Sequence, residues 1–194
     1  MIKLRESPIF VQSMKQIIKI LEAGKLLLAP TDTIWGILCD ATNPSAVDKV
    51  YDLKKRPDSK AMVCMVADLE MLQKHIDDLP EKLDYYINDQ RPTTVIYNNP
   101  KGIAQNAIAQ GNTVAIRIVN HHFCTPLIKT FGKPLISTSA NISGAPNPHK
   151  FSDISQEILI GVDHIIEIDT DKINLQPSRI IKIEPRGEIS LLRA

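Results

Sequence analysis

Short apolar runs that fit strands alternate along this chain with segments that carry apolar residues at helical spacing. The run from Lys25 to Pro30 is apolar and closed by proline, which is typical of a buried strand, whereas Val11 to Leu21 repeats apolar residues three and four positions apart. No repeat, low-complexity tract or linker interrupts this alternation. The pattern therefore predicts one α/β domain over residues 1–194, with a mixed β-sheet flanked by helices.

Capping signals mark several of the expected boundaries. Gly24 and Gly132 stand where a left-handed residue ends a helix, and Asn43 or Ser45 and then Asp68 are residue types that cap helix starts. We expect helices at residues 11–21, 46–53, 69–76, 81–88, 123–131 and 152–160. Strands are expected at residues 25–30, 34–39, 61–66, 93–97, 113–118, 135–136, 164–168, 179–183 and 189–192.

The charge balance excludes a protein that coats nucleic acid through its bulk charge. Lysine and arginine total 23 against 22 aspartate and glutamate, a formal net charge of +1. A hydrophobic content of 43% in 194 residues is enough for a substantial core. Any anion site must therefore come from a local basic pocket.

Cysteine usage and the N-terminal sequence point to the cytoplasm. Cys39, Cys64 and Cys124 are odd in number, widely spaced and set in apolar runs, so we interpret them as core thiols in a reducing compartment. The N-terminus carries no signal-peptide pattern, and no run approaches the ~20 apolar residues of a membrane span. We expect a cytoplasmic protein without a membrane segment.

The segment Ser137 to Gly144 is more polar than a turn requires. It follows the apolar residues Leu135 and Ile136 and contains four hydroxyls and the Asn141 amide. Such side chains often satisfy their own backbone in turns, which is the structural alternative. Donors and acceptors gathered at a strand end also suit an anion or a sugar hydroxyl, so the segment is a candidate ligand floor.

A basic cluster, Lys54, Arg56 and Lys60, lies at an expected helix end and in the loop beyond it. The chain contains neither a Walker loop nor a Rossmann phosphate turn, so any nucleotide must be held by other groups. Three cations within seven residues can neutralise a triphosphate. Solvated charges favoured by the helix dipole are the commoner explanation for such a cluster, and both alternatives stay open.

Polar groups at two further strands can bind either a ligand or the protein itself. Thr31-Asp32-Thr33 follows an expected strand, where open α/β sheets bind ligands, and Asp32 can hold an ammonium group; turn chemistry is the alternative. Arg117 alternates with apolar neighbours, so its charge needs an anionic partner. A substrate carboxylate or an internal Asp or Glu would serve.

Other common catalytic patterns are missing from the sequence. His121 and His122 stand near an expected helix start, where capping or surface roles are more common than metal ligation. There is no HExxH and no convincing zinc spacing. A nucleophile elbow GxSxG is also absent, so Ser139 is interpreted as a hydrogen-bonding group rather than a nucleophile.

Four segments, taken together and in order, closely resemble the YrdC family of threonylcarbamoyl-adenylate synthases. The pairing of a KxR pattern with an SxN pattern, here Lys54 with Arg56 and Ser139 with Asn141, is specific to that family. The resemblance runs from about Lys25 to the C-terminus. The segments are Pro30 to Gly36, Lys54 to Pro57 with Lys60, Thr113 to Arg117, and Ser137 to Gly144.

The resemblance implies a twisted mixed sheet with a positively charged concave cavity. It also implies that L-threonine, bicarbonate or carbon dioxide, and ATP are joined into threonylcarbamoyl-AMP and pyrophosphate, which makes the enzyme a nucleotidyltransferase. Mg²⁺ would accompany ATP, bridging phosphate oxygens without predicted protein ligands. A separate transferase complex would then pass the threonylcarbamoyl group to tRNA, at the adenosine beside the anticodon.

The resemblance also assigns residue roles. Lys54 and Arg56 would be catalytic, stabilising charge in the transition state. The residues expected at ATP are Lys54, Arg56, Lys60, Thr113, Ser139, Asn141, His149 and Arg193. The residues expected at threonine are Thr33, Met65, Arg117, Ser139 and Ser178, with Arg117 taking the carboxylate.

Two other functions stay open at this stage. The first is an RNA-binding or ribosome-maturation module, with tRNA or double-stranded RNA in the same basic cavity, although the near-neutral charge and few aromatic residues disfavour it. The second is a related carbamoyl- or acyl-adenylating enzyme that uses another amino acid. Met65 and Arg179 keep this alternative open, because both differ from residues common in the family.

Overall fold

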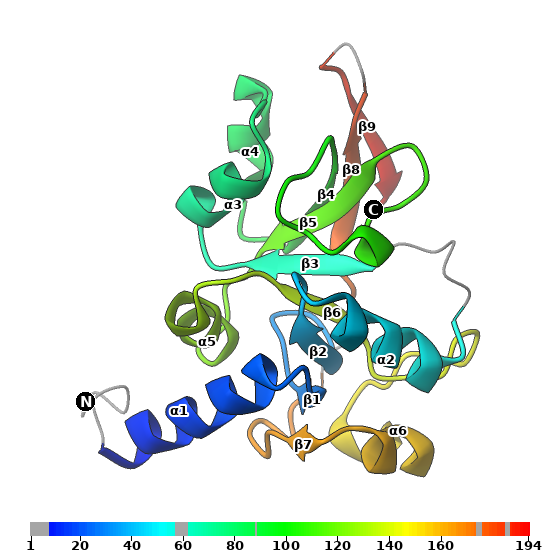
Figure 1. Ribbon diagram of the computed structural model, residues 1–194. Helices are drawn as coiled ribbons and strands as arrows, with labels where there is room; N and C mark the ends of the chain where they lie inside the picture. The colour runs from blue at the N-terminus through cyan, green and yellow to red at the C-terminus, as the bar shows by residue number, and fades with distance from the viewer. Residues whose placement is uncertain (1–7, 57–61, 88, 174–175, 185–186) are drawn as a thin grey trace.

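One mixed β-sheet organises the molecule (Figure 1). The computed structural model describes residues 8–56, 62–87, 89–173, 176–184 and 187–194. Within these residues the strands are β1 (Leu27–Ala29), β2 (Gly36–Asp40), β3 (Val63–Val66), β4 (Thr93–Asn98), β5 (Thr113–Ile118), β6 (Leu135–Ser139), β7 (His164–Ile165), β8 (Arg179–Ile183) and β9 (Ile189–Arg193). Their order in the sheet is β7-β1-β2-β6-β3-β5-β4-β8-β9.

Three of the strand pairs are parallel, β1 with β7, β3 with β5 and β4 with β8, and the others are antiparallel. The mixed sheet predicted from the alternating pattern is therefore confirmed. It places β6 between β2 and β3, so the polar end of β6 lies near the middle of the sheet.

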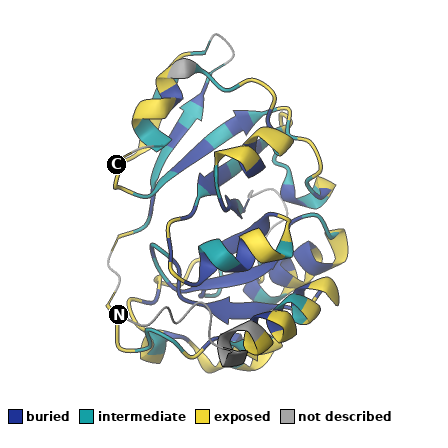
Figure 2. Ribbon diagram, turned by 90° about the vertical axis from the view of Figure 1, so that its left-hand side faces the viewer, coloured by how far each residue is buried: buried dark blue, intermediate teal, exposed yellow. Residues whose placement is uncertain are grey.

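Helices cover this sheet. They are α1 (Pro8–Glu22), α2 (Pro44–Lys54), α3 (Leu69–His75), α4 (Asp84–Ile87), α5 (Cys124–Phe131) and α6 (Gln156–Gly161), with 3-10 turns at Glu81–Leu83, Gln105–Ala107 and Phe151–Asp153. Helix α1 packs against β2 and α5, α2 against β2 and α6, and α3 against β3 and β5. Figure 2 shows buried residues concentrated on the strands and exposed residues on the outer sides of the helices.

The predicted caps are present. Asn43 Oδ1 accepts from the backbone N–H of Ala46 at 3.3 Å, which selects Asn43 over Ser45 as the cap of α2. Asp68 Oδ1 accepts from the backbone N–H of Met71 at 3.0 Å at the start of α3. Gly24 and Gly132 both adopt positive φ, at 64° and 74°, where each ends its helix.

Several predicted elements differ from the structure. The helix expected at 81–88 is a 3-10 turn followed by the short α4, and the strand expected at 25–30 covers Leu27–Ala29 only. The helix expected at 152–160 is a 3-10 turn followed by α6, and the strand expected at 164–168 pairs over two residues only. The strand expected at 135–136 is longer than predicted. It continues to Ser139, because Ser137, Thr138 and Ser139 pair with β2, so most of the hydroxyls belong to the sheet rather than to the turn.

The cysteines are free and buried, as predicted. Cys39, Cys64 and Cys124 lie in the core, and burial raises the pKa of all three thiols, that of Cys64 to about 12. They are therefore core residues and not nucleophiles at neutral pH. Within the described residues, no helix is both long and apolar enough to cross a membrane.

Candidate active site

A pocket of about 270 Å³ opens where β6, β2 and β5 meet the segment that leads into β8. Three arginines line it, Arg56, Arg117 and Arg193, and none of its described lining residues carries a carboxylate. The lining also includes Thr33, Trp35, Gly36, Met62, Ser137, Thr138, Ser139, Asn147 and Ser178. Three guanidinium groups around so small a volume favour an anionic ligand.

The floor of the pocket depends on the close pairing of β2 with β6. Gly36 lies opposite Ser139, and a methyl group at Gly36 would meet the Ser137 hydroxyl at 3.1 Å and the Thr138 carbonyl at 3.4 Å. A side chain at this position would require the Ser137 hydroxyl to shift by a few tenths of an ångström. Gly36 therefore lets the hydroxyls of β6 form a continuous floor.

Arg117 is held by an internal acid. Its side chain is 5% exposed, and its Nη2 lies 3.1 Å from Oδ1 of Asp32, whose side chain is 6% exposed. The same Nη2 donates to Thr33 Oγ1 at 3.4 Å. Of the two partners left open for Arg117, the internal Asp is present, and the guanidinium still lines the pocket.

The Thr31–Thr33 segment shows both features expected of it, local turn hydrogen bonds and side chains directed to the site. The Thr31 hydroxyl donates to the Ile34 carbonyl at 2.7 Å and accepts from the Thr33 backbone N–H at 3.1 Å, which is local turn chemistry. Thr33 lines the pocket, and Asp32 orients Arg117. The turn therefore places two functional groups while it satisfies its own backbone.

Ser178, which directly precedes β8, bonds residues of β4 and β9 at the edge of the pocket. Its hydroxyl lies 2.7 Å from Thr94 Oγ1 in β4, and its carbonyl accepts from Nε and Nη2 of Arg193 in β9 at 3.0 and 2.7 Å. Burial, and next the charge of Arg117, hold the pKa of Arg193 below its usual value. Both arginines thus act on the same small volume.

The end of α2 sends three consecutive basic residues in different directions. Lys55 adopts a left-handed conformation, with φ 51° and ψ 42°, and its ammonium pairs with Glu157 at the surface. On either side of it, Lys54 is buried and Arg56 lines the pocket, where burial lowers the pKa of Arg56. The left-handed backbone of Lys55 therefore explains why the first and third residues of the KxR pattern lie at the site while the middle one lies at the surface.

The ammonium group of Lys54 lies on the turn that follows β6. Nζ donates to the carbonyl oxygens of Ser139 and Asn141 at 2.5 and 2.6 Å and to Asn141 Oδ1 at 3.2 Å. Burial, and next the charge of Arg56, lower the pKa of Lys54 to about 8. The KxR and SxN patterns, 85 residues apart, meet at this group.

A second pocket, of about 420 Å³, adjoins the first one. Asn147 lines both. Asn141 and His149 line the second pocket, together with apolar groups from Ala140, Ile142 and two prolines. A ligand with an anionic centre and a flat apolar end can span the two pockets.

The structure brings together most of the site residues predicted from sequence. Those that line the arginine pocket are Thr33, Arg56, Arg117, Ser139, Ser178 and Arg193, while Asn141 and His149 line the adjoining pocket. Three others lie elsewhere: Lys54 beneath the turn, Met65 buried with its sulfur 3.6 Å from Arg117 Nη2, and Thr113 opposite Asn98 at the start of β5. Lys60 lies outside the described residues.

Sequence reasoning missed two polar residues of the site. Thr94 is fully buried, bonds Ser178 and accepts a long, 3.5 Å hydrogen bond from Arg117 Nη1. Asn147 joins the two pockets. A threonine at an inward-facing position of an apolar strand was the available signal for Thr94, whereas Asn147 stands between two prolines and carries no comparable signal.

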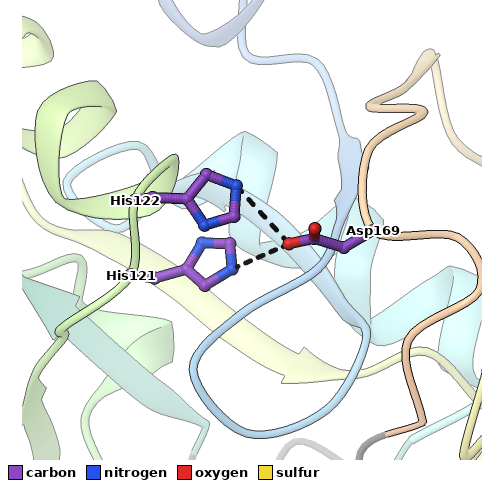
Figure 3. A group of neighbouring side chains, drawn as sticks. All are labelled: His121, His122 and Asp169. Carbon is purple, nitrogen blue, oxygen red and sulfur yellow. Dashed lines mark ion pairs between the residues drawn. The ribbon is translucent and has the colours of Figure 1, made fainter. Parts of the chain in front are cut away.

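The described residues contain one group with metal-ligand spacing, His121, His122 and Asp169 (Figure 3). The Nε2 atoms of the two histidines lie 3.6 and 3.4 Å from Asp169 Oδ2. However, His121 Nδ1 accepts from the backbone N–H groups of Phe123 and Cys124, each at 3.4 Å, so a neutral ring carries its hydrogen on Nε2. His121 therefore contacts the backbone at the start of α5, the kind of local role expected for it from the sequence.

The buried cap predicts an acid-sensitive stability. Burial, and next the charge of His122, lower the pKa of His121 from 6.5 to about 4, although Asp169 and Asp32 oppose the shift. Between these values the unfolded chain binds a proton that the folded chain does not, so the free energy of unfolding should fall as pH drops from about 6.5 to about 4.

Chemical denaturation across this pH range measures the effect. His121→Asn keeps an acceptor near the helix start but cannot titrate, so its stability should fall less over the same window. His122→Asn removes the neighbouring charge that helps to lower the pKa of His121, so it should narrow the pH window but keep the acid-sensitive stability. Equal pH dependence in wild type and His121→Asn would contradict the role of His121.

A family model named for Sua5, YciO and YrdC, with the description "Telomere recombination", matches residues 19–194. A putative threonylcarbamoyl-AMP synthase of Methanocaldococcus jannaschii is 36% identical over 172 residues, 87% of this chain and 79% of that protein. A threonylcarbamoyl-AMP synthase of Vibrio parahaemolyticus is 31% identical over 152 residues, 76% of this chain and 82% of that protein.

Solved structures share the fold. P. abyssi Sua5 complexed with L-threonine superposes with a TM-score of 0.82 at 23% identity, covering 94% of this chain. The match spans 54% of the Sua5 chain, so this chain corresponds to about half of it. The α/β architecture predicted from sequence is thereby confirmed.

Proposed function

Because the chain belongs to the Sua5–YciO–YrdC family, we propose that it is a threonylcarbamoyl-AMP synthase. It joins L-threonine, carbon dioxide or bicarbonate, and ATP into threonylcarbamoyl-AMP and pyrophosphate, and is therefore a nucleotidyltransferase. The observation that carries the proposal is the small pocket ringed by Arg56, Arg117 and Arg193 beside the hydroxyls of Thr33 and Ser139.

The threonine end of the pocket fits the wall formed by Arg117, Thr33 and Ser178. Arg117 is anchored by Asp32 and presents a guanidinium to the pocket, where it can bind a carboxylate. The hydroxyls of Thr33 and Ser178 supply hydrogen-bonding groups for the remaining polar atoms. P. abyssi Sua5, which has the same fold, is known in complex with L-threonine.

The nucleotide end fits the remaining arginines and the adjoining pocket. Arg56 and Arg193 lie where phosphates would enter, and the pocket that contains His149 and Asn141 has apolar surface for a base. The ATP contacts of Lys60 and Thr113 and the threonine contact of Met65 stay predictions.

The chemistry concentrates negative charge. The threonine amine adds to carbon dioxide and loses a proton to give a carbamate; a carbamate oxygen then attacks the α-phosphorus of ATP, and pyrophosphate leaves. Preorganised guanidinium groups stabilise the charge that develops on the phosphate oxygens. We assign this stabilisation to Arg56, because its guanidinium group lines the pocket.

Mg²⁺ fits this site as a companion of ATP. The described lining of the arginine pocket offers hydroxyl and amide oxygens but no carboxylate, whereas Asp153 and Glu157 line the adjoining pocket. Beside the arginines the ion would therefore be held mainly by phosphate oxygens, as is common for Mg²⁺ with nucleotides. It would neutralise part of the triphosphate charge. The product would then go to a separate transferase complex that modifies tRNA.

Threonine rather than another amino acid is favoured by the place of Arg179. This residue, one of the positions that differ from the family pattern, donates to Asp89 at 2.9 Å and lies 4.9 Å from the Tyr86 ring. It is not among the lining residues of the arginine pocket. The departure therefore leaves the proposed threonine wall unchanged.

Pyrophosphate release measured with the purified chain tests the proposal. Release should require ATP, bicarbonate and threonine together, and mass spectrometry should identify threonylcarbamoyl-AMP. Each amino acid of a panel replaces threonine in turn, and serine is the critical comparison. Release that does not depend on threonine would overturn the synthase, and a salt-dependent shift of tRNA without turnover would favour the RNA-binding alternative.

A further inference from the structure

Lys54 connects the two sequence patterns of the candidate site through both ends of the residue. Its ammonium group bonds the carbonyls of Ser139 and Asn141 and the Asn141 side chain, as described above. Its backbone carbonyl accepts from the Ser143 N–H at 2.8 Å. The last residue of α2 thus holds both sides of the turn over residues 139–143.

These contacts use the full donor capacity of the side chain. A lysine ammonium group has three N–H donors and no acceptor, and the structure provides three oxygen acceptors for it. The residue is 1% exposed and does not line either pocket. A phosphate contact would require the ammonium group to give up at least one of its three hydrogen bonds to the turn over residues 139–143.

The turn held by Lys54 carries the polar groups that face the pockets. The Ser139 hydroxyl donates to Asn141 Oδ1 at 2.5 Å, so Oδ1 receives hydrogen bonds from both Lys54 and Ser139. Ser139 lines the arginine pocket and Asn141 the adjoining one. The position of both residues therefore depends on the same ammonium group.

We propose that Lys54 is a positioning residue, which fixes the Ser139–Asn141 turn for catalysis and does not itself contact the phosphates. This inference rests on the proposed function for its kinetic consequences. A displacement of about 1 Å in such a group can cost ~10²-fold in rate. Loss of the ammonium should therefore reduce catalysis through the turn, whereas Arg56 acts on the substrate directly.

A double-mutant cycle separates positioning from contact. Lys54→Met keeps an unbranched apolar stem and should lower kcat/KM for ATP by ~10²-fold. Ser139→Ala should cost much less in the Lys54→Met background than in wild type, because the hydroxyl is already misplaced there. If the loss of kcat/KM in the double variant equals the product of the two single losses within about twofold, the two groups act independently and the proposal is overturned. Wild-type activity in Lys54→Met would also overturn it.

A second measurement uses the wild-type protein, so it does not depend on whether a variant folds. The ¹⁵Nζ signal of Lys54 is followed by NMR while a nonhydrolysable ATP analogue with Mg²⁺ is added until the Ser139 amide signal shifts. We expect the Lys54 signal to stay in place, because its acceptors do not change. A shift of Lys54 Nζ together with Ser139 would show a phosphate contact and overturn the proposal.

The titration of Lys54 offers a third readout. The turn partners of its ammonium are uncharged, and Arg56 is the charged group that acts with burial to bring its pKa to about 8. Deprotonation removes one of the three donors, so kcat/KM should fall as pH rises through about 8. This descending limb should be missing in Lys54→Met, and its persistence there would contradict the role of Lys54.

Failure of the proposed function and failure of this inference are distinguishable. If wild type releases no pyrophosphate with threonine, the synthase proposal fails, and the turn is then tested by hydrogen exchange without substrate. Lys54→Met should speed exchange of the Ser143 and Asn141 amides and leave the amides of β5 protected. Unchanged exchange of the turn amides would overturn the positioning role whatever the reaction is.

Discussion

Replacing Arg117 by methionine is expected to abolish threonine-dependent pyrophosphate release and to lower the free energy of unfolding by about 3–5 kcal/mol. Both effects come from one guanidinium group. It lines the arginine pocket, and it also neutralises Asp32, whose side chain is 6% exposed. Without Arg117 the carboxylate stays in the core with no opposite charge at 3.1 Å. Steady-state kinetics and urea denaturation measure the two effects.

The double variant Asp32→Asn/Arg117→Met is the matched control. It removes the stranded carboxylate, so it should recover much of the lost stability while it remains inactive with threonine. Recovery of activity together with stability would show that Arg117 serves the fold alone. A single Arg117→Met variant as stable as wild type would contradict the energetic role of the buried ion pair.

Replacing Arg56 by alanine is expected to lower kcat by ~10²- to 10³-fold, the usual cost of removing one preorganised donor of charge stabilisation. Arg56 lines the arginine pocket. Since we propose that it faces the phosphates, its loss should affect the reaction with ATP far more than the fold. Single-turnover pyrophosphate release gives the rate, and thermal unfolding checks that the variant remains folded.

Lys55→Ala is the control for this prediction. Lys55 is the next residue along the chain and has the same formal charge, but its side chain is 65% exposed and pairs with Glu157 at the surface. Exposed ion pairs of this kind contribute little, about 0–1 kcal/mol, so Lys55→Ala should keep nearly full activity. Equal losses in the two variants would mean that net charge near α2, and not the position of Arg56, supports the reaction.

Local sequence signals predicted the elements of the fold well. Asn43 and Asp68 cap helices because their short side chains reach backbone N–H groups three residues ahead, which is a local interaction. Sequence reasoning was less accurate where the sheet itself decides the boundary. Ser137, Thr138 and Ser139 have turn chemistry, yet pairing with β2 keeps them in a strand.

The sequence predicted which residues belong to the candidate site better than it predicted how their side chains are oriented. Arg56, Arg117 and Ser139 do line one pocket, as the motifs suggested. The sequence did not show that Lys54 turns beneath the site. That orientation follows from the left-handed conformation of Lys55 and from acceptors 85 and 87 residues away along the chain.

The sequence by itself determined the α/β class, the family and the residue types that meet at the pocket, because periodicity, caps and motifs are written in local order. Only the tertiary structure decided which partner each charge takes. Arg117 pairs with Asp32, and Lys54 bonds a turn on another strand. The physical reason is that a buried charge must be matched by whatever folding brings within hydrogen-bonding distance, and no local pattern records that distance.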